Sequence, residues 1–285
     1  MNASTQPPVR PAAVAGTFYP ALPDVLRRTV DDLLTAAAQP RPPDLASVAA
    51  ASPALGRPKV LIVPHAGYVY SGPIAASAYR LLSNAASDIQ RVVLLGPAHR
   101  VYVPGIAAAG AASFDTPLGA VACDNAWLSR VSGDAIVQSP RAHAPEHCLE
   151  VQLPFLQRLL PHARIVPLLV SDAAPGLVGP ALEQLWGGPE TLIVISSDLS
   201  HYLPYAQAQQ VDADTARHIL ALDPNLDGEQ ACGCAAVNGA LWVARRKQLV
   251  PRLLDLRSSG DTAGSRREVV GYAAFALYES DGLAP

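Results

Sequence analysis

Four runs of apolar residues in this chain have the length and composition of buried β-strands. Each run is rich in Val, Ile and Leu and shows little alternation between apolar and polar positions, which is typical of strands covered by helices on both faces. A further run near the C-terminal end, 268–278, predicts a last strand that pairs antiparallel. The four predicted core strands are residues 60–63, 92–95, 164–170 and 192–195.

Stretches with helical periodicity alternate with these runs. In the first, 23–38, the apolar residues are spaced so that they share one face of a helix. Strand alternating with helix predicts an α/β fold of three layers, in which helices cover both faces of a central, mostly parallel sheet. A more β-like segment, 101–123, contains the turn sequence Thr116-Pro117-Leu118-Gly119. The other predicted helices are 74–82, 149–160, 177–186, 206–222 and 234–248.

The length and composition favour one large domain. We expect a single domain over residues 1–285, with 41–58, rich in Pro, Ala and Ser, as a loop. Half of the residues are hydrophobic, which is ample for a sizeable core. The net charge of −3 and the absence of a Lys/Arg cluster argue against a nucleic-acid partner. No apolar run reaches the roughly 20 residues of a membrane span, and the N-terminal sequence does not resemble a secretory signal, so we expect a cytoplasmic protein.

Potential metal ligands follow three of the predicted core strands. His65 follows the first, His99 the second and Asp198 the last, with His201 three residues further on. Side chains just past the carboxyl ends of neighbouring parallel strands meet in one crevice. Each residue alone is explained by structural hydrogen bonding or helix capping, but together they predict a metal site. His201 would be its general acid or base, its tautomer fixed by Asp198 or Glu150.

Two further segments could contribute to this site. Glu146 and Glu150 have the spacing of one helix face, and we expect His147 to lie nearest the site. The alternative is that Glu146 caps the helix while Glu150 lies on its solvated flank. After His65, small residues and a helix beginning near Pro73 would direct a helix N-terminus toward the same place.

The chain has four cysteines, too few to cross-link a domain of this length, so we expect reduced thiols. Cys232 and Cys234 precede a predicted helix, where a thiol has a lowered pKa and suits either a nucleophile or a soft metal ligand. The alternative is an inert buried cysteine. The spacing alone does not choose between the two residues.

Several short motifs, in this order, resemble those of the Memo family, the Memo component of the AmmeMemoRadiSam system. The resemblance covers about residues 9–277. The motifs are Ala15-Gly16-Thr17-Phe18-Tyr19-Pro20, Pro64-His65-Ala66-Gly67-Tyr68 with Ser71-Gly72, Gly96-Pro97-Ala98-His99, Thr116-Pro117-Leu118-Gly119, Glu146-His147 with Glu150 and Leu153-Pro154-Phe155, Ser196-Ser197-Asp198 with His201-Tyr202, and Ala231-Cys232-Gly233.

This resemblance implies a fold like that of the class III extradiol dioxygenases, which are non-haem-iron enzymes. It implies a metal held by His65, His99 and Cys232, with Asp198 and His201 lining the same pocket. His201 would correspond to the acid/base histidine of the dioxygenases. The family has a cysteine where those enzymes have a carboxylate, which makes the site softer and copper a candidate beside iron. Cys234, where the family usually has a non-thiol residue, is the departure in this chain.

We therefore expect one iron or copper ion at His65, His99 and Cys232, and O₂-dependent or redox chemistry on a small molecule. Asp198, His201, Glu150 and His147 would surround the metal ligands. One rival hypothesis is a zinc hydrolase, in which the metal activates water. Another is a non-catalytic module that binds a partner or sequesters copper. The resemblance also implies radical-SAM system proteins as partners, and a homodimer is compatible with the sequence.

Overall fold

The computed structural model describes residues 8–37, 56–83, 88–131 and 135–279. At its centre is a nine-stranded sheet with four parallel neighbours, in the order β2 (Val60–Val63), β9 (Thr191–Ser196), β3 (Arg91–Pro97) and β8 (Arg164–Val170). Antiparallel strands extend it on both sides, β12 (Val269–Tyr278) beside β2 and β4 (Ile106–Ala108) beside β8. The other strands are β7 (Ile136–Gln138), beside β4, and β10 (His201–Leu203) and β11 (Val250–Ser258), both beside β12.

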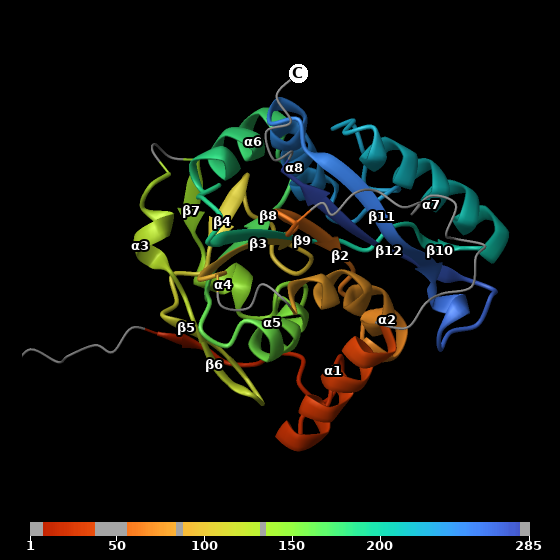
Figure 1. The fold of residues 1–285 in the computed structure, drawn as a ribbon, viewed down its shortest axis with the longest axis horizontal. Coiled ribbons are helices and arrows are strands. Elements are labelled where there is room, and N and C mark those ends of the chain that lie inside the picture. Colours follow the sequence, from red (N-terminus) through yellow and green to blue (C-terminus); the bar gives the residue numbers. More distant parts are fainter. Residues whose placement is uncertain (1–7, 38–55, 84–87, 132–134, 280–285) are drawn as a thin grey trace, which may run out of the picture.

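Helices cover both faces of this sheet (Figure 1). Because successive strand residues point to opposite faces, Leu61 and Val63 pack in one core cluster while Val60 and Ile62 pack in the other. The three-layer α/β architecture that the sequence predicts is therefore confirmed. The first cluster lies under α1 (Pro23–Ala37), α2 (Tyr68–Tyr79) and α5 (Leu153–Leu159), and the second under α6 (Pro175–Gln184), α7 (Tyr205–Leu220) and α8 (Cys234–Arg246). Short helices are α3 (Asn125–Leu128), α4 (Pro140–His143), η2 (Arg80–Leu82), η3 (Glu150–Gln152) and η4 (Ser259–Asp261).

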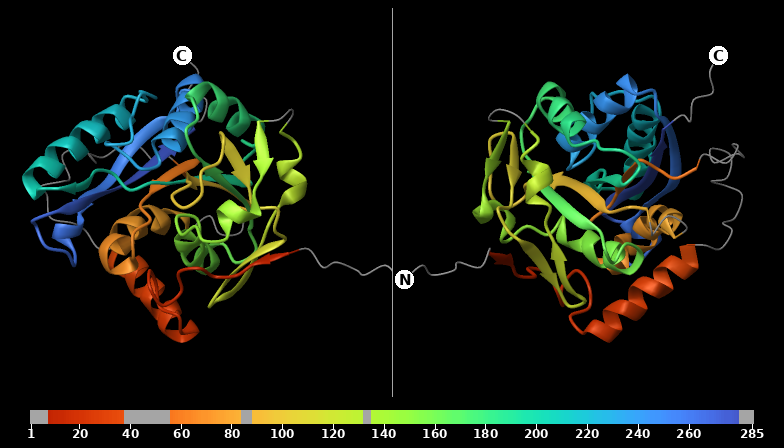
Figure 2. Two further views of the ribbon diagram at one scale, coloured as in Figure 1. Left: turned by 180° about the vertical axis from the view of Figure 1, so that it is seen from behind. Right: turned by 60° about the vertical axis from the view of Figure 1, so that its left-hand side comes forward.

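A second, smaller sheet ties the N-terminal segment to the domain. β1 (Val9–Arg10) pairs parallel with β5 (Ser113–Thr116), which forms a hairpin with β6 (Gly119–Ala122). Figure 2 shows β1 alongside this hairpin from two further directions. The β-like character predicted for 101–123 is thus present. Arg10, at the end of β1, is brought close to residues about 140 positions away in the sequence.

The element boundaries differ from the prediction at two places that bear on the site. Helix α2 begins at Tyr68 rather than near Pro73, because the N–H of Tyr68 donates to the carbonyl of Phe18, and the hydroxyl of Ser71 donates to the carbonyl of Ala66. The predicted helix 149–160 begins as the 3-10 helix η3, and residues 146–147 before it are irregular.

Strand β11 is absent from the sequence prediction. Its side chains are mostly half-buried, and charged residues such as Arg252 and Arg257 interrupt any apolar pattern. Pairing with residues 271–278 of β12 supplies the backbone hydrogen bonds that make it a strand. Of the predicted loop 41–58, residues 41–55 lie outside the described residues. Within the segments that the structure describes, no helix is both long and apolar enough to cross a membrane.

Candidate metal centre

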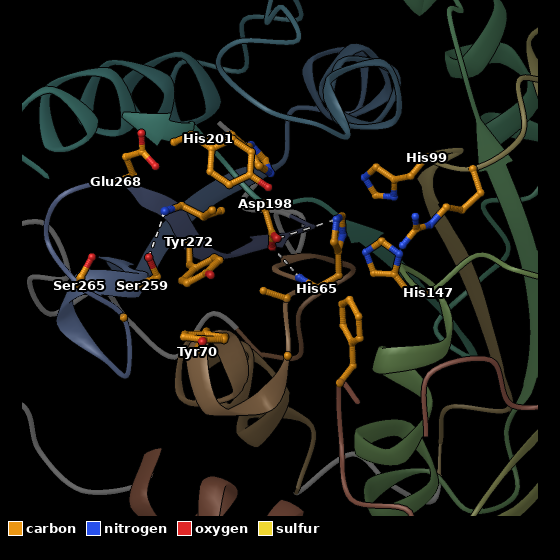
Figure 3. Close-up of a pocket in the computed structure, with 17 residues that line it drawn as sticks. His65, Tyr70, His99, His147, Asp198, His201, Ser259, Ser265, Glu268 and Tyr272 are labelled. Atoms are coloured by element: carbon orange, nitrogen blue, oxygen red, sulfur yellow. Dashed lines mark hydrogen bonds and ion pairs between the residues drawn. The ribbon is translucent and has the colours of Figure 1, made fainter. Parts of the chain in front are cut away.

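Three adjacent strands bring the predicted strand-end residues together. β9 lies between β2 and β3, and all three run parallel. His65, Asp198 and His99 each follow the end of one of these strands by two residues. The side chains consequently emerge at one edge of the sheet and line one pocket (Figure 3). The ring centroids of His65 and His99 are 5.1 Å apart.

His65 is held in one orientation by a buried network of hydrogen bonds. Its Nδ1 lies 3.0 Å from Ser196 Oγ, whose hydroxyl donates to the carbonyl of Cys148 and accepts from Gln152 Nε2. The amide oxygen of Gln152 in turn accepts from the hydroxyl of Tyr79. Since the proton of Ser196 is already used, we infer that His65 Nδ1 carries a proton and donates it to Ser196. The lone pair of Nε2 is then free to bind a metal.

His99 is oriented in the same manner by Glu146. The carboxylate accepts from the backbone N–H of His99 at 2.6 Å and lies 3.0 Å from its Nδ1. Glu146 is buried, which by itself raises the pKa of its carboxyl, but the adjacent imidazoles of His147 and His99 outweigh this and lower the pKa. An ionised Glu146 therefore receives the Nδ1 proton of His99 and leaves its Nε2 free for a metal.

Glu146→Gln should weaken metal binding by about 10–100-fold, because one of the two acceptors for His99 becomes an amide donor. The measurement is a competition titration of the metal against a chromogenic chelator. Glu229→Gln, on an exposed loop, is the control and should bind as the wild type does. Wild-type affinity in Glu146→Gln would show that the carboxylate does not orient His99.

His147 completes a cluster of three imidazoles. Its ring centroid lies 4.8 Å from that of His99 and 5.4 Å from that of His65. One ring nitrogen from each histidine lies within 4.8 Å of the others. The Nδ1 of His147 is buried without a hydrogen-bond partner, although Glu146 Oε1 is 3.1 Å away. His147 was expected only beside the metal ligands, but the structure makes it a third potential ligand.

The electrostatics of the cluster favour a neutral imidazole at His65, its most buried member. Burial lowers the pKa of His65, and the neighbouring His99 and His147 lower it further. A neutral imidazole is the form that binds metals. Three imidazoles converging in a partly buried pocket are therefore suited to a metal ion, which would bind the lone pairs that point toward one another.

Cys232 lies beside this cluster, and Cys234 does not. Cys232 Sγ is 3.3 Å from His65 Nε2, whereas Cys234 begins α8 and packs against the second core cluster. Gly233 between them fits tightly, since a Cβ there would lie 2.8 Å from the side chain of Ser197. The sequence predicted a lowered thiol pKa at this position. That prediction is wrong, because burial raises the pKa of both thiols. A metal bound by Cys232 must displace the thiol proton.

Asp198 and His201 approach the pocket from β9 and β10. The carboxylate of Asp198 accepts from the backbone N–H of His65 at 2.7 Å, and its other oxygen is 3.9 Å from His65 Nε2. Burial raises the pKa of Asp198. No helix directly follows Asp198, so the helix-cap interpretation does not apply. In Figure 3, His201 lies on the other side of Asp198 from His99 and His147.

The expectation for Glu150 does not fit its position. The residue is fully buried and is not among those that line the pocket. Its carboxylate accepts hydrogen bonds from the side chains of Arg10 and Tyr19 and from the backbone N–H groups of Ala13 and Val14. With every oxygen occupied by the N-terminal segment, Glu150 cannot orient His201. Glu146, a helix cap in the alternative interpretation, is the carboxylate that contacts the histidines.

The pocket has a volume of about 650 Å³ and includes residues that sequence reasoning missed. The ring of Phe18, in the N-terminal segment, lies 4.6 Å from that of His147. Arg100 directly follows His99. Three tyrosines and the loop between β11 and β12 form further parts of the wall. Those residues are Tyr70, Tyr202, Tyr272, Ser259, Gly264, Ser265 and Glu268.

Comparison with known proteins gives one consistent result. The sequence model of the family described as "Memo-like protein" matches residues 10–276. A MEMO1 family protein of Ignicoccus hospitalis is 35% identical over 287 residues, covering 93% of this chain and 97% of the relative. MEMO1 family proteins of Sulfolobus acidocaldarius and Methanopyrus kandleri are each 33% identical, again covering 93% of this chain and 97% of the relative.

Proposed function

Since this chain belongs to the Memo family, we propose that it binds one iron or copper ion and carries out O₂-dependent or other redox chemistry on a small molecule. The observation that carries this proposal is the fixed orientation of His65 and His99. The Nδ1 atoms of both are hydrogen-bonded to buried acceptors, which leaves the Nε2 lone pairs for a metal, that of His65 beside the sulfur of Cys232. Metal-binding histidines are characteristically fixed in this way.

His65 and His99 would hold the ion, with Cys232 as the third ligand. A thiolate beside two imidazoles is a soft donor set, which favours iron or copper over magnesium or calcium. An iron or copper ion would supply one-electron redox chemistry and a binding position for O₂ or substrate. His147 is the alternative third ligand, because its ring lies in the same cluster.

The remaining residues would transfer protons, position His65 and shield the cluster. His201 lines the pocket and can donate or accept a proton at a substrate bound there. Asp198 lies close to His65 Nε2 and fixes the backbone of His65. Phe18 packs on His147 and excludes water from that side of the cluster.

A zinc hydrolase is the second candidate, and the three-histidine cluster is the observation that favours it. Three imidazoles are the protein ligands of some catalytic zinc sites, where the ion lowers the pKa of bound water to about 7. In that case His201 would act as the base at the attacking water.

The deciding experiment is elemental analysis of anaerobically purified protein. We expect iron or copper near one equivalent in the wild type and none in His65→Ala or His99→Ala. Loss of the metal in Cys232→Ser but not in Cys234→Ser or His147→Ala would identify the third ligand. Loss in His147→Ala alone would assign that place to the histidine.

Other outcomes would redirect the proposal. Zinc alone, with activity that persists without O₂, would favour the hydrolase. No metal in any sample would contradict both enzymatic candidates and favour a binding module. Full metal content in His65→Ala would overturn the ligand assignment, provided that circular dichroism shows the variant to be folded.

A further inference from the structure

The pocket extends well beyond the histidine cluster. Figure 3 shows His99 and His147 at one end and Ser259, Ser265 and Glu268 toward the other, with Tyr272 between. A volume of about 650 Å³ is more than a metal ion and O₂ need, and is in the range of pockets that hold small organic ligands. The far end is therefore large enough to hold a part of a ligand that does not touch the histidines.

The exposed charged side chains in the wall, Glu268 at the far end and Arg100 at the near end, differ in sign. At the far end Glu268 is exposed, and the structure gives its carboxylate no hydrogen-bond or ion-pair partner among the described residues. The neighbouring Arg266 does not neutralise it, because its guanidinium stacks on Tyr205 at 4.4 Å and lies 3.6 Å from Asp261. At the near end, Arg100 follows His99 in the pocket wall.

Three tyrosines line the space between these ends. Tyr70, Tyr202 and Tyr272 all line this pocket, and Tyr272 is buried in its wall. Tyr202 is 71% exposed, which is unusual for an aromatic residue. Aromatic faces attract organic cations.

The backbone at Tyr202 supports a binding role for this residue. Its φ of +57° lies in the left-handed region, which bulky residues rarely adopt. The flanking residues His201 and Leu203 pair with Val270 and Val269 on β12, with an irregular register between them. This pairing keeps Tyr202 at the pocket mouth despite the strained backbone, and such strain often marks a functional site.

We propose that the far half of the pocket binds an organic ammonium group between the three tyrosines and the carboxylate of Glu268. The substrate would thus be an amine, oriented with its cation at Glu268 and away from the guanidinium of Arg100, and with its reactive part toward the histidines. This inference rests on the proposed function for the identity of the reactive end. The recognition of the cation depends only on residues of the far half.

Two probes of nearly equal shape test this recognition. At pH 7.5, 2-phenylethylamine is a cation, whereas 2-phenylethanol is neutral. We expect the amine to bind the wild type about tenfold more tightly, since its ammonium group donates a charge-assisted hydrogen bond to Glu268 that the alcohol does not match. Dissociation constants are measured by calorimetric titration or, for weak binding, by NMR. Glu268→Gln should abolish the preference and leave the affinity for the alcohol unchanged, whereas Glu229→Gln should keep the preference.

The same titrations separate this inference from the proposed function. Each is done with chelator-treated and with metal-loaded protein. A preference for the amine in both forms supports the cation site, even if the protein as purified holds no redox metal. Equal affinities for the two probes, a preference that survives in Glu268→Gln, or no binding of either probe would overturn the inference while leaving the metal proposal intact. Tyr202→Ala should weaken the binding of the amine more than the binding of the alcohol. An equal loss of affinity for both probes would contradict a cation–π contact.

Discussion

Glu150→Ala should lower the free energy of unfolding by about 3–5 kcal/mol, because it removes one member of a buried ion pair. Arg10 would lose the carboxylate that it contacts, and Tyr19 and two backbone N–H groups would lose their acceptor. Arg10 also donates to the carbonyls of His143 and Glu146. The loop that carries Glu146 and His147 should therefore become less ordered, and metal affinity should fall as well.

Urea unfolding followed by circular dichroism measures this change. Glu229→Ala, on the surface, is the matched control and should shift the unfolding free energy by less than about 0.5 kcal/mol. Glu150→Gln should be intermediate, since it keeps one acceptor oxygen. A Glu150→Ala protein with wild-type stability but without activity would contradict this structural role and restore the catalytic one.

Asp212→Asn should stabilise the protein at pH 7.5 by up to about 3 kcal/mol and have little effect at pH 4. Burial raises the pKa of Asp212 from 3.8 to about 6 in the folded protein. The folded state consequently holds a proton more tightly than the unfolded state, and stability falls as the pH rises through this interval. A shift of about two units corresponds to roughly 3 kcal/mol. Asparagine removes the buried charge and can still accept from the N–H of Ser200, 3.0 Å from the carboxylate.

Urea unfolding at pH 4, 5.5 and 7.5 tests this prediction. Asp214→Asn, exposed on the same helix, is the control and should not stabilise the protein at pH 7.5. The carboxylate of Asp212 packs against the backbone of Gly271, in the space that a Cβ of residue 271 would take. The side chain at position 212 therefore has little room to move. Equal destabilisation of Asp212→Asn at all three pH values would show that the substitution acts through packing or hydrogen bonding rather than through the buried charge, and would contradict the prediction.

The parallel strands and the residues at their ends were predictable from the sequence. Apolar runs without alternation specify strands buried on both faces, and His65, His99 and Asp198 each follow such a run. In a parallel sheet this position alone brings them to one edge. Cys232 entered the prediction through family resemblance, and the structure places its sulfur beside His65.

The segment around Glu146 could not be predicted in the same way. Helical spacing put Glu146 and Glu150 on one face, but Arg10 binds this segment from 140 residues away. With this contact in place the two carboxylates have different partners: Glu150 binds the N-terminal segment and Glu146 binds His99. Local periodicity contains no information about such a partner.

The sequence by itself determined the layers, the core strands and the position of the histidines at the strand ends. These features follow from hydrophobic periodicity and from the direction of each strand, which are local properties of the chain. Only the tertiary structure decided that His147 joins the cluster, that Glu146 rather than Glu150 contacts it, and that Tyr202 and Glu268 share its pocket. These pairings join segments distant in sequence, and their positions depend on packing, burial and charge in the folded protein.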